Sequence, residues 1–261
     1  MTPAVPPIQE LAAPAHWRTV DVISDLHLQA SEPATVAAWQ RYLQTTPADA
    51  LFILGDLFEV WVGDDAIGDT RDADSRFEAQ CCALLRAAAQ HMAVFYMHGN
   101  RDFLAGPAFL AHCGTTGLTD PTVLEFAGRR TLLSHGDALC LDDVDYQRFR
   151  RLARSAAWQR DFLAQPLATR RAQARAMRNE SEARKHSGQP YADVDGPAAA
   201  AWLRAARADT LVHGHTHRPA EHALAPGQRR LVLSDWDGAA QPPRAEVLRL
   251  DAAGLHRVVP D

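Results

Sequence analysis

Short apolar runs recur along the chain, and each one ends in a cluster of polar residues. The runs cover residues 19–23, 51–54, 93–97, 131–133 and 210–212. They do not alternate strictly between apolar and polar side chains, as a half-exposed strand does. Such runs are typical of strands that are covered on both faces. We therefore expect five buried strands.

Helices and hairpins are expected between these runs. Ser31 is a plausible N-cap and Pro33 suits the first turn of a helix that reaches about Leu43. An alanine-rich segment, 74–90, predicts a second helix. Short apolar segments flank glycine-containing turns at 127–129 and 252–254, which predicts two hairpins. Together these elements indicate an α/β fold in which helices cover a mixed sheet.

Residues 143–208 interrupt this pattern because their composition is mostly helical, with a break expected at Pro166. From Arg148 to Lys185 there are eleven Lys or Arg residues and three acidic residues. Two interpretations are equally compatible with this composition. The segment is either a basic helical cap inserted into the main domain, or a solvated helix pair that packs on the core.

The N-terminal segment is expected to be a mobile tail over residues 1–18. It holds four prolines in its first sixteen residues and lacks the basic start and apolar run of a secretion signal. The remainder, 19–261, is expected to be one domain that contains the 143–208 insertion.

The overall composition is ordinary for a globular protein and excludes few functions. Of the 261 residues, 47% are apolar and 23% are charged, and the net charge of −5 gives no reason to expect nucleic-acid binding. No run approaches the roughly 20 apolar residues that cross a bilayer. The four cysteines lack zinc-site spacing, which favours reduced thiols.

The polar clusters supply the candidate chemistry. In open α/β sheets, groups that follow the strands meet at one edge. Burying many ionisable groups there is costly unless cations neutralise them. Carboxylate, amide and imidazole ligands without thiolate suit Mn²⁺, Fe²⁺ or Zn²⁺. The candidate ligands are Asp25, His27, Asp56, Asn100, His135, His213 and His215.

Seven ligands are too many for one ion and suit two. Asp25 and His27 are two residues apart, so in an extended segment their side chains point the same way, and His213 and His215 repeat this spacing. Asp56 is the candidate for a bridging carboxylate, because Asp25 already shares its strand end with His27.

These five blocks, in this order, resemble the calcineurin-like metallophosphoesterase superfamily. The resemblance covers Asp25-Leu26-His27, Gly55-Asp56, Gly99-Asn100-Arg101-Asp102, His135-Gly136-Asp137 and His213-Gly214-His215. It implies a four-layer α/β-β/α sandwich with an inserted helical cap. It also implies one metal ion on Asp25, His27, Asp56 and His215, and a second on Asp56, Asn100, His135 and His213.

One departure narrows the resemblance. Most of the superfamily has histidine where this chain has Arg101. Segments 54–65, 99–103 and 213–219 resemble the subfamily of pyrophosphatases that hydrolyse UDP-2,3-diacylglucosamine in the lipid A synthesis of Gram-negative bacteria. This resemblance implies cleavage to UMP and 2,3-diacylglucosamine 1-phosphate (lipid X), by a water molecule that two divalent ions, most simply Mn²⁺, activate.

The subfamily also implies substrate contacts. They fall on Asn100, Arg101, Asp143, Ser181 and His213, and Asn100, Arg101 and His213 are expected to assist the reaction. Arg101 is alternatively an ion-pair partner of Asp102 or another nearby acid. The subfamily places Asn and then Lys shortly after the serine, whereas Lys185 and Gly188 stand there in this chain, so these two contacts stay unassigned.

The same resemblance implies a cellular setting. The basic cap becomes a lid that shelters two acyl chains and rests on an anionic membrane surface. The expected location is the cytoplasmic face of the inner membrane, peripherally, with no nucleic acid and no obligate protein partner.

Two other functions stay open on the sequence. One is a metallophosphodiesterase or nucleotide pyrophosphatase with a water-soluble substrate, and the other is a non-catalytic, metal-containing binding module. Three further residues near the blocks have no assigned chemistry. His217 and Arg218 are expected either to order the last loop or to contact the metal ligands and orient them, and Asp137 either holds His135 or caps a turn.

Overall fold

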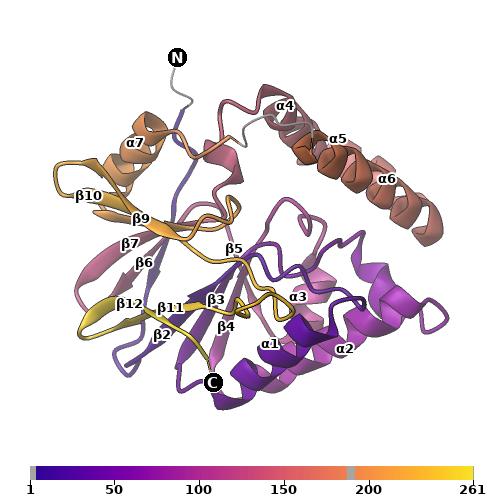
Figure 1. Cartoon of the computed structure of the whole chain (residues 1–261), viewed down its shortest axis with the longest axis horizontal. Coiled ribbons are helices and arrows are strands. Elements are labelled where there is room, and N and C mark those ends of the chain that lie inside the picture. Colours follow the sequence, from indigo (N-terminus) through magenta and orange to yellow (C-terminus); the bar gives the residue numbers. More distant parts are fainter. Residues whose placement is uncertain (1–3, 187–191, 261) are drawn as a thin grey trace.

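Two six-stranded sheets pack face to face in a computed structural model that describes residues 4–186 and 192–260 (Figure 1). The first sheet has the order β12 (Gly254–Val258), β11 (Val247–Asp251), β2 (Val20–Ile23), β3 (Ala50–Leu54), β4 (Ala93–Met97) and β5 (Thr116–Leu118). The second has the order β1 (Gln9–Ala12), β6 (Thr122–Phe126), β7 (Arg129–Ser134), β8 (Thr210–His213), β10 (Gln228–Val232) and β9 (Ala220–Ala225).

The five predicted strands are β2, β3, β4, β7 and β8, and each is buried on both faces. In β3, Phe52 and Leu54 pack between the sheets, whereas Leu51 and Ile53 pack against the outer helices. Because alternate side chains enter two different apolar layers, the sequence of such a strand shows no polar alternation. The two predicted hairpins are also present, as β6–β7 and β11–β12.

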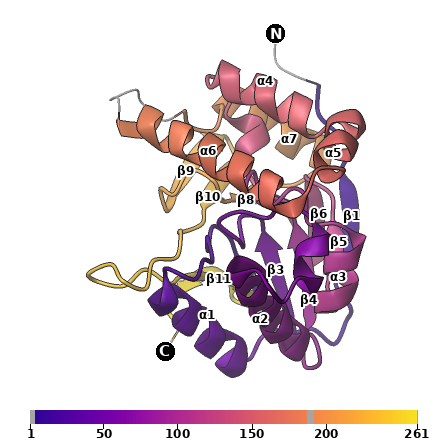
Figure 2. The same cartoon turned by 90° about the vertical axis from the view of Figure 1, so that its right-hand side faces the viewer.

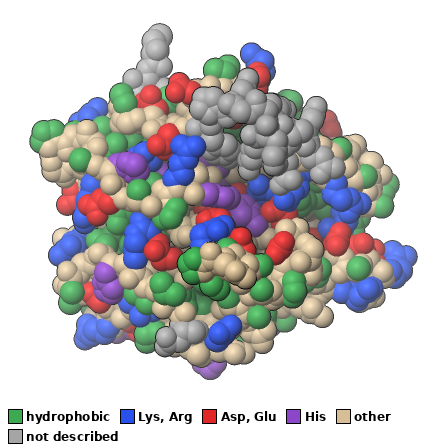
Figure 3. All heavy atoms as spheres, viewed as in Figure 1, with side chains coloured by type: hydrophobic (Ala, Val, Ile, Leu, Met, Phe, Trp, Pro, Cys, Tyr) green, Lys and Arg blue, Asp and Glu red, His purple; other side chains and the backbone are tan. Residues whose placement is uncertain are grey.

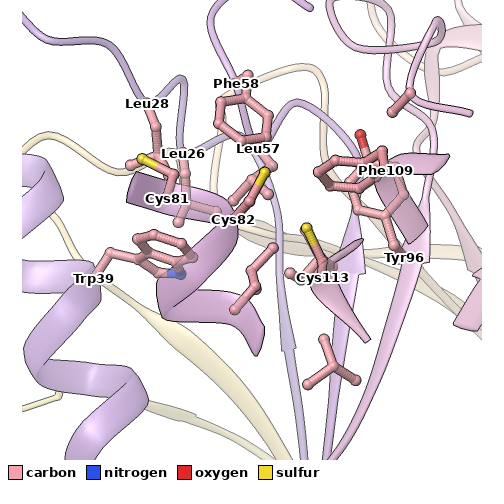
Figure 4. Packing of buried hydrophobic residues seen from close by; sticks show 14 of the residues in the cluster. Leu26, Leu28, Trp39, Leu57, Phe58, Cys81, Cys82, Tyr96, Phe109 and Cys113 are labelled. Carbon is pink, nitrogen blue, oxygen red and sulfur yellow. The ribbon is translucent and has the colours of Figure 1, made fainter. Parts of the chain in front are cut away.

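Three helices cover the outer face of the first sheet: α1 (Pro33–Thr45), α2 (Ala73–Ala88) and α3 (Pro107–Cys113). Figure 4 shows Trp39, Cys82 and Phe109 in the core beneath them. The predicted helix at 33–43 extends to Thr45, and the residue before it is Glu32 and not Ser31. The Asp72 carboxylate accepts a 2.9 Å hydrogen bond from Ser75 N and so caps α2.

The helix α7 (Gly196–Ala206) covers the outer face of the second sheet. Its Trp202 and Leu203 pack with Leu132 and Leu211 of that sheet. Helices therefore cover both outer faces of the paired sheets, which confirms the expected four-layer α/β-β/α sandwich. Residues 64–68 and 137–139 form the short 3₁₀ helices η1 (Asp64–Gly68) and η2 (Asp137–Leu139).

The remaining helices form the cap: α4 (Val144–Ala153), α5 (Ala156–Leu163) and α6 (Leu167–His186). They lie together on one side of the sandwich (Figures 1 and 2), where α5 and α6 also contact the core that the helices of the first sheet cover. The expected insertion at 143–208 thus contains two kinds of helix, because α7 belongs to the sandwich and α4–α6 do not.

Buried arginines attach the cap to the sandwich. Arg171 of α6 forms hydrogen bonds of 2.9 and 2.8 Å with the two carboxylate oxygens of Glu78 in α2. Arg170 is 1% exposed and donates to Val62 O and Asp65. Part of the basic charge in this segment therefore serves internal contacts and is not a solvated face.

The N-terminal segment corrects one expectation. The predicted mobile tail over residues 1–18 is wrong for residues 9–17. Strand β1 pairs in parallel with β6, from Gln9 opposite Thr122 to Ala12 opposite Glu125. Trp17 is buried against Phe52 and Phe95 between the sheets. The prolines flank this strand and leave residues 9–12 free to donate backbone hydrogen bonds.

Among the described residues, no helix is both long and apolar enough to traverse a bilayer. The four cysteines are buried free thiols, as the sequence predicts. Cys140 belongs to the core cluster beneath α7. Its burial raises the pKa of the thiol above the usual value.

Candidate metal centre

The loops that follow five strands from both sheets meet at one edge of the sandwich. The loops after β2 and β3 are joined by backbone hydrogen bonds, with Asp25 N donating to Gly55 O at 3.1 Å and His27 N donating to Asp56 O at 3.0 Å. The loop after β8 joins them, because His215 N donates to the Asp25 carboxylate at 2.9 Å. These bonds bring acidic and imidazole side chains from distant segments together.

The backbone at this edge is strained. Asp25, His27, Asp56, His215 and His217 all have positive φ, between 49° and 67°. Residues other than glycine rarely adopt positive φ, and those that do are often found at functional sites. At Gly99 the loops approach so closely that a Cβ would lie 2.0 Å from an oxygen of Asp56. Only glycine allows this contact.

One group of side chains surrounds Asp56. Potential ligand atoms of Asp25, Asp56 and His135 all lie within 4.8 Å of one another, and all three residues are buried. Asn100 Oδ1 lies 3.0 Å from His135 Nε2 and 2.8 Å from His215 Nδ1. The other ring nitrogen of His135 lies 2.8 Å from Leu54 O, which orients the ring.

A second group surrounds Asp25. His27 Nε2 and His217 Nε2 lie 4.0 and 3.3 Å from Asp25 Oδ1, and 3.1 Å from each other. Asp25 Oδ1 is buried and has no hydrogen-bond partner, whereas Oδ2 accepts from Ser24 and His215 N. A buried acceptor that faces two ring nitrogens without a hydrogen bond is the arrangement that a cation satisfies. Both groups therefore fit divalent metal ions.

The structure places His213 apart from these groups. His213 is the last residue of β8, and it faces the same side of the second sheet as Leu211, which packs toward α7. Its Nδ1 lies 2.9 Å from Gly214 O and its Nε2 lies 3.2 Å from Arg230 Nη1. Both ring nitrogens thus face protein groups. The structure brings His217 to the site in place of His213.

Charges in the site shift several pKa values. Burial raises the pKa of Asp56 to about 6. Burial alone would lower the pKa of His135, but the nearby carboxylates of Asp56 and Asp25 raise it to about 9. Burial lowers the pKa of His215 to about 3, with a contribution from His135. Metal binding requires neutral imidazoles beside carboxylates, so His215 already has the required state, whereas His135 would release a proton when a metal ion binds.

Arg101 lies beside this cluster. Its backbone N donates to Asp56 Oδ1 at 2.9 Å, and its Nε lies 3.7 Å from Asp56 Oδ2. Its Nη1 donates to Glu59. The alternative expected for Arg101, an ion pair with Asp102 or another nearby acid, holds for Glu59 and Asp56 and not for Asp102. Asp102 instead accepts from Leu57 N and Gly99 N, both at 2.8 Å, and so joins the loops that carry Asp56 and Asn100.

The cap meets the site through Asp137 in η2, directly after the His135 loop. Its carboxylate accepts from Tyr146 Oη and Arg150 Nε, at 2.5 and 2.7 Å. Arg154 donates to Gly99 O at 2.8 Å, and the Tyr146 ring stacks on His215 with the ring centres 5.9 Å apart. Asp137 therefore holds α4 over the metal ligands, a role the sequence left undecided.

The two expected substrate contacts in the cap differ in what the structure describes. Asp143 caps the start of α4 by accepting from Tyr146 N at 3.0 Å, and its side chain is exposed. Ser181 and Lys185 lie in α6, but their side chains are outside the described residues, as is the whole of Gly188. His98, next to the site, is half-buried and its Nε2 lies 2.6 Å from Ala105 O.

Sequence reasoning missed two features of the site. Glu59 was not singled out, and His217 was expected to order the last loop or to support the metal ligands, not to be one of them. For His217 the run His-Gly-His-Thr-His offered a signal, because its histidines at 215 and 217 also have the two-residue spacing. On the face shown in Figure 3, histidine side chains gather beside acidic and basic ones near the middle of the view.

Comparison with known proteins agrees with this geometry. Residues 18–219 match the family of calcineurin-like phosphoesterases. A relative from Ralstonia nicotianae, named UDP-2,3-diacylglucosamine hydrolase, is 48% identical over 87% of each chain. Relatives with the same name from Chromobacterium violaceum and Xanthomonas campestris are 44% and 43% identical. These alignments cover 90% and 89% of this chain, and 96% and 95% of the relatives.

Proposed function

The chain belongs to the calcineurin-like phosphoesterase family, and we propose that it hydrolyses the pyrophosphate bond of UDP-2,3-diacylglucosamine. The products are UMP and 2,3-diacylglucosamine 1-phosphate. The observation that carries the proposal is the buried cluster around Asp25 and Asp56, placed next to Arg101 and under a basic cap. The similarity to hydrolases of this name over 87% of the chain supports the substrate.

The residues that would hold two divalent ions are those of the two groups described above. They are Asp25, His27, Asp56, Asn100, His135, His215 and His217. Oxygen and imidazole ligands without thiolate are compatible with Mn²⁺, the ion that we propose here. Bound there, the ions would lower the pKa of a water molecule and neutralise charge on the phosphoryl oxygens. His213 is not part of this proposed set.

The chain's own residues would position the diphosphate. Arg101 is a permanent cation with a planar fork of donors, which matches the oxygens of a phosphate group. Asn100 presents its amide between His135 and His215, where it would help to stabilise charge that develops on the phosphoryl oxygens. Asp143 and Ser181, at the start of α4 and in α6, remain proposed contacts for the rest of the substrate.

The cap supports a peripheral location on the cytoplasmic face of the inner membrane. Of the described residues, the large apolar side chains that are exposed are Val144, Phe149, Leu152, Leu163, Met177 and Val259, and all but Val259 lie on α4–α6. Apolar side chains among many arginines are typical of surfaces that lie on anionic lipid. A lipid substrate would reach the site from such a surface.

The test is release of UMP from UDP-2,3-diacylglucosamine in detergent, with Mn²⁺ and then with a chelator. The proposal expects release that the chelator abolishes. Asp56→Ala should lower the rate by more than the 10- to 100-fold that is typical of losing a residue beside a metal ligand, while the circular dichroism spectrum stays unchanged. Hydrolysis of an aryl phosphodiester without UMP release would keep the metal centre and reject the substrate.

A further inference from the structure

Glu59 is a buried carboxylate at the edge of the metal centre. It lies three residues after Asp56 and is 7% exposed. Two backbone hydrogen bonds fix its place against the neighbouring loop: Leu28 N donates to Leu57 O at 2.8 Å, and Glu59 N donates to Leu28 O at 3.2 Å. The side chain of Glu59 is therefore held beside the loop that carries His27.

The two oxygens of Glu59 face different partners. Oε2 lies 3.3 Å from Nδ1 of His27. Oε1 accepts from Nη1 of Arg101 and pairs with Arg178, which comes from α6 of the cap. One carboxylate thus contacts a proposed metal ligand, the arginine next to the metals and a helix of the cap.

The contact between Glu59 and His27 determines which ring nitrogen of His27 faces the proposed metal centre. With Nδ1 toward Glu59, the opposite nitrogen, Nε2, faces Asp25 and His217. Metal-binding histidines commonly donate the hydrogen of their other nitrogen to a carboxylate, which fixes the tautomer and the ring orientation. Glu59 Oε2 lies 3.3 Å from this nitrogen of His27, in the place that such a carboxylate occupies.

The contact with Arg101 determines where its guanidinium lies. Arg101 extends from the loop after β4, between the carboxylates of Asp56 and Glu59. A long side chain loses much rotational entropy when it is held in one place, so a fixed counter-charge favours the ordered position. Without Glu59, the guanidinium would keep only the longer contact with Asp56.

We propose that Glu59 is a positioning residue for the reaction: its Oε2 orients His27 toward the metal ions, and its Oε1 holds Arg101 and the cap residue Arg178 at the same point. This inference deepens the proposed function and rests on its metal centre. It assigns to Glu59 no contact with substrate.

The test compares two buried carboxylates that both pair with arginines of α6. Glu59→Gln keeps the size of the side chain and removes its charge. Glu78→Gln is the matched control, because Glu78 pairs with Arg171 between α2 and α6 and has no contact with the proposed ligands. The full chain is stripped with a chelator, and Mn²⁺ alone is titrated by calorimetry, without substrate.

The expected result is a Mn²⁺ affinity about 10- to 100-fold weaker in Glu59→Gln, the usual cost of losing a residue that orients a ligand, and unchanged in Glu78→Gln. At saturating Mn²⁺, kcat/KM of Glu59→Gln should stay below the wild-type value because Arg101 is no longer held. Wild-type affinity in Glu59→Gln, or an equal loss in both variants, would overturn the proposal.

Glu59→Asp decides the question if Glu59→Gln does not fold. Its carboxylate is one methylene shorter and cannot reach His27 and Arg101 together, so weaker Mn²⁺ binding is expected, and wild-type binding would overturn the inference. Because Mn²⁺ binding is measured without lipid, it separates the two proposals. Wild-type protein that binds Mn²⁺ but releases no UMP would reject the substrate and leave the role of Glu59 standing.

Discussion

His213 and His217 show how backbone conformation decides which histidines meet at the site. His213 ends a regular strand, so its side chain follows the alternation of β8 and faces outward with Leu211. His215 and His217 lie beyond the strand with positive φ, and this turns both side chains toward Asp25 and Asn100. Equal spacing in sequence therefore does not give equal direction once the strand has ended.

This difference predicts opposite effects for two substitutions. His217→Gln should weaken Mn²⁺ binding by more than about tenfold, because it removes a ring nitrogen next to Asp25. His213→Gln should leave Mn²⁺ binding within about twofold and lower thermal stability instead, since His213 is buried against Arg230. Metal titration and thermal unfolding of both variants provide the test. The reverse order of affinities would restore His213 to the ligand set.

Among the elements, η2 and α4 link the cap to the metal ligands. Asp137 is fully buried and is paired with Tyr146 and Arg150 of α4. Burial alone would raise the pKa of Asp137, but Arg150, His135 and Arg154 hold it below the usual range. The carboxylate is therefore ionised, and it orders the helix whose Tyr146 stacks on His215.

Asp137→Asn should loosen α4 while leaving the sandwich folded. Removing the charge leaves Arg150 without its short ion pair, and breaking such a buried pair typically costs about 3–5 kcal/mol. Faster hydrogen exchange in α4 and a raised KM for the lipid substrate are expected. Asp145→Asn is the control, because Asp145 and Arg148 are both more than 70% exposed and such pairs contribute about 0–1 kcal/mol. Equal effects in both variants would contradict the role of Asp137.

The elements that could be predicted from sequence are those defined by local patterns. The apolar runs gave β2, β3, β4, β7 and β8, and glycine turns gave the two hairpins. Strand β1 was missed because nothing in residues 9–12 shows that β6, over a hundred residues away, has a free edge for it. Whether a segment forms a strand depends partly on the strand with which it pairs.

The same limit applies to the site. Asp25, Asp56 and His135 were predicted because each comes within two residues of the end of a strand, so local sequence places it at the sheet edge. Glu59 was missed because it lies beyond its strand and its partners, His27 and Arg178, are distant in sequence. Contacts between loops depend on how the two sheets pack, which no local pattern encodes.

In the whole molecule, Trp17 connects the N-terminal segment to the core between the sheets. Its ring meets Phe52 and Phe95 edge-on, with ring centres 6.5 and 5.9 Å away. Both sheets contribute to this core, so Trp17 stabilises their packing and with it the convergence of loops from β3 and β7.

Trp17→Ala should lower the free energy of unfolding by about 3–5 kcal/mol, as for other buried aromatic side chains. The kcat of the folded fraction should stay at the wild-type value, because Trp17 contacts no proposed ligand. Urea unfolding with a parallel activity assay measures both quantities. The control is Glu10→Ala, which removes an exposed ion pair between Glu10 of the N-terminal segment and Arg130 of β7. It should lower the free energy of unfolding by less than about 1 kcal/mol. A loss of similar size in Glu10→Ala would show that the ion pair, and not the core contact, holds this segment.

The orientation of the whole molecule on a membrane follows from where apolar side chains are exposed. Val144 and Leu152 on α4 are 60% and 56% exposed, among arginines, whereas Val259 near the C-terminus is 73% exposed but lies outside the cap. If the cap faces the lipid, only the first two enter the bilayer surface. The variant Val144→Ser/Leu152→Ser should therefore bind anionic vesicles several-fold more weakly in sedimentation, and Val259→Ser should bind as the wild type does.

Salt should weaken vesicle binding of the wild type and of both variants, because salt screens the attraction between the arginines and the anionic lipid. A loss in Val259→Ser without a loss in the double variant would mean that the opposite side of the molecule faces the membrane.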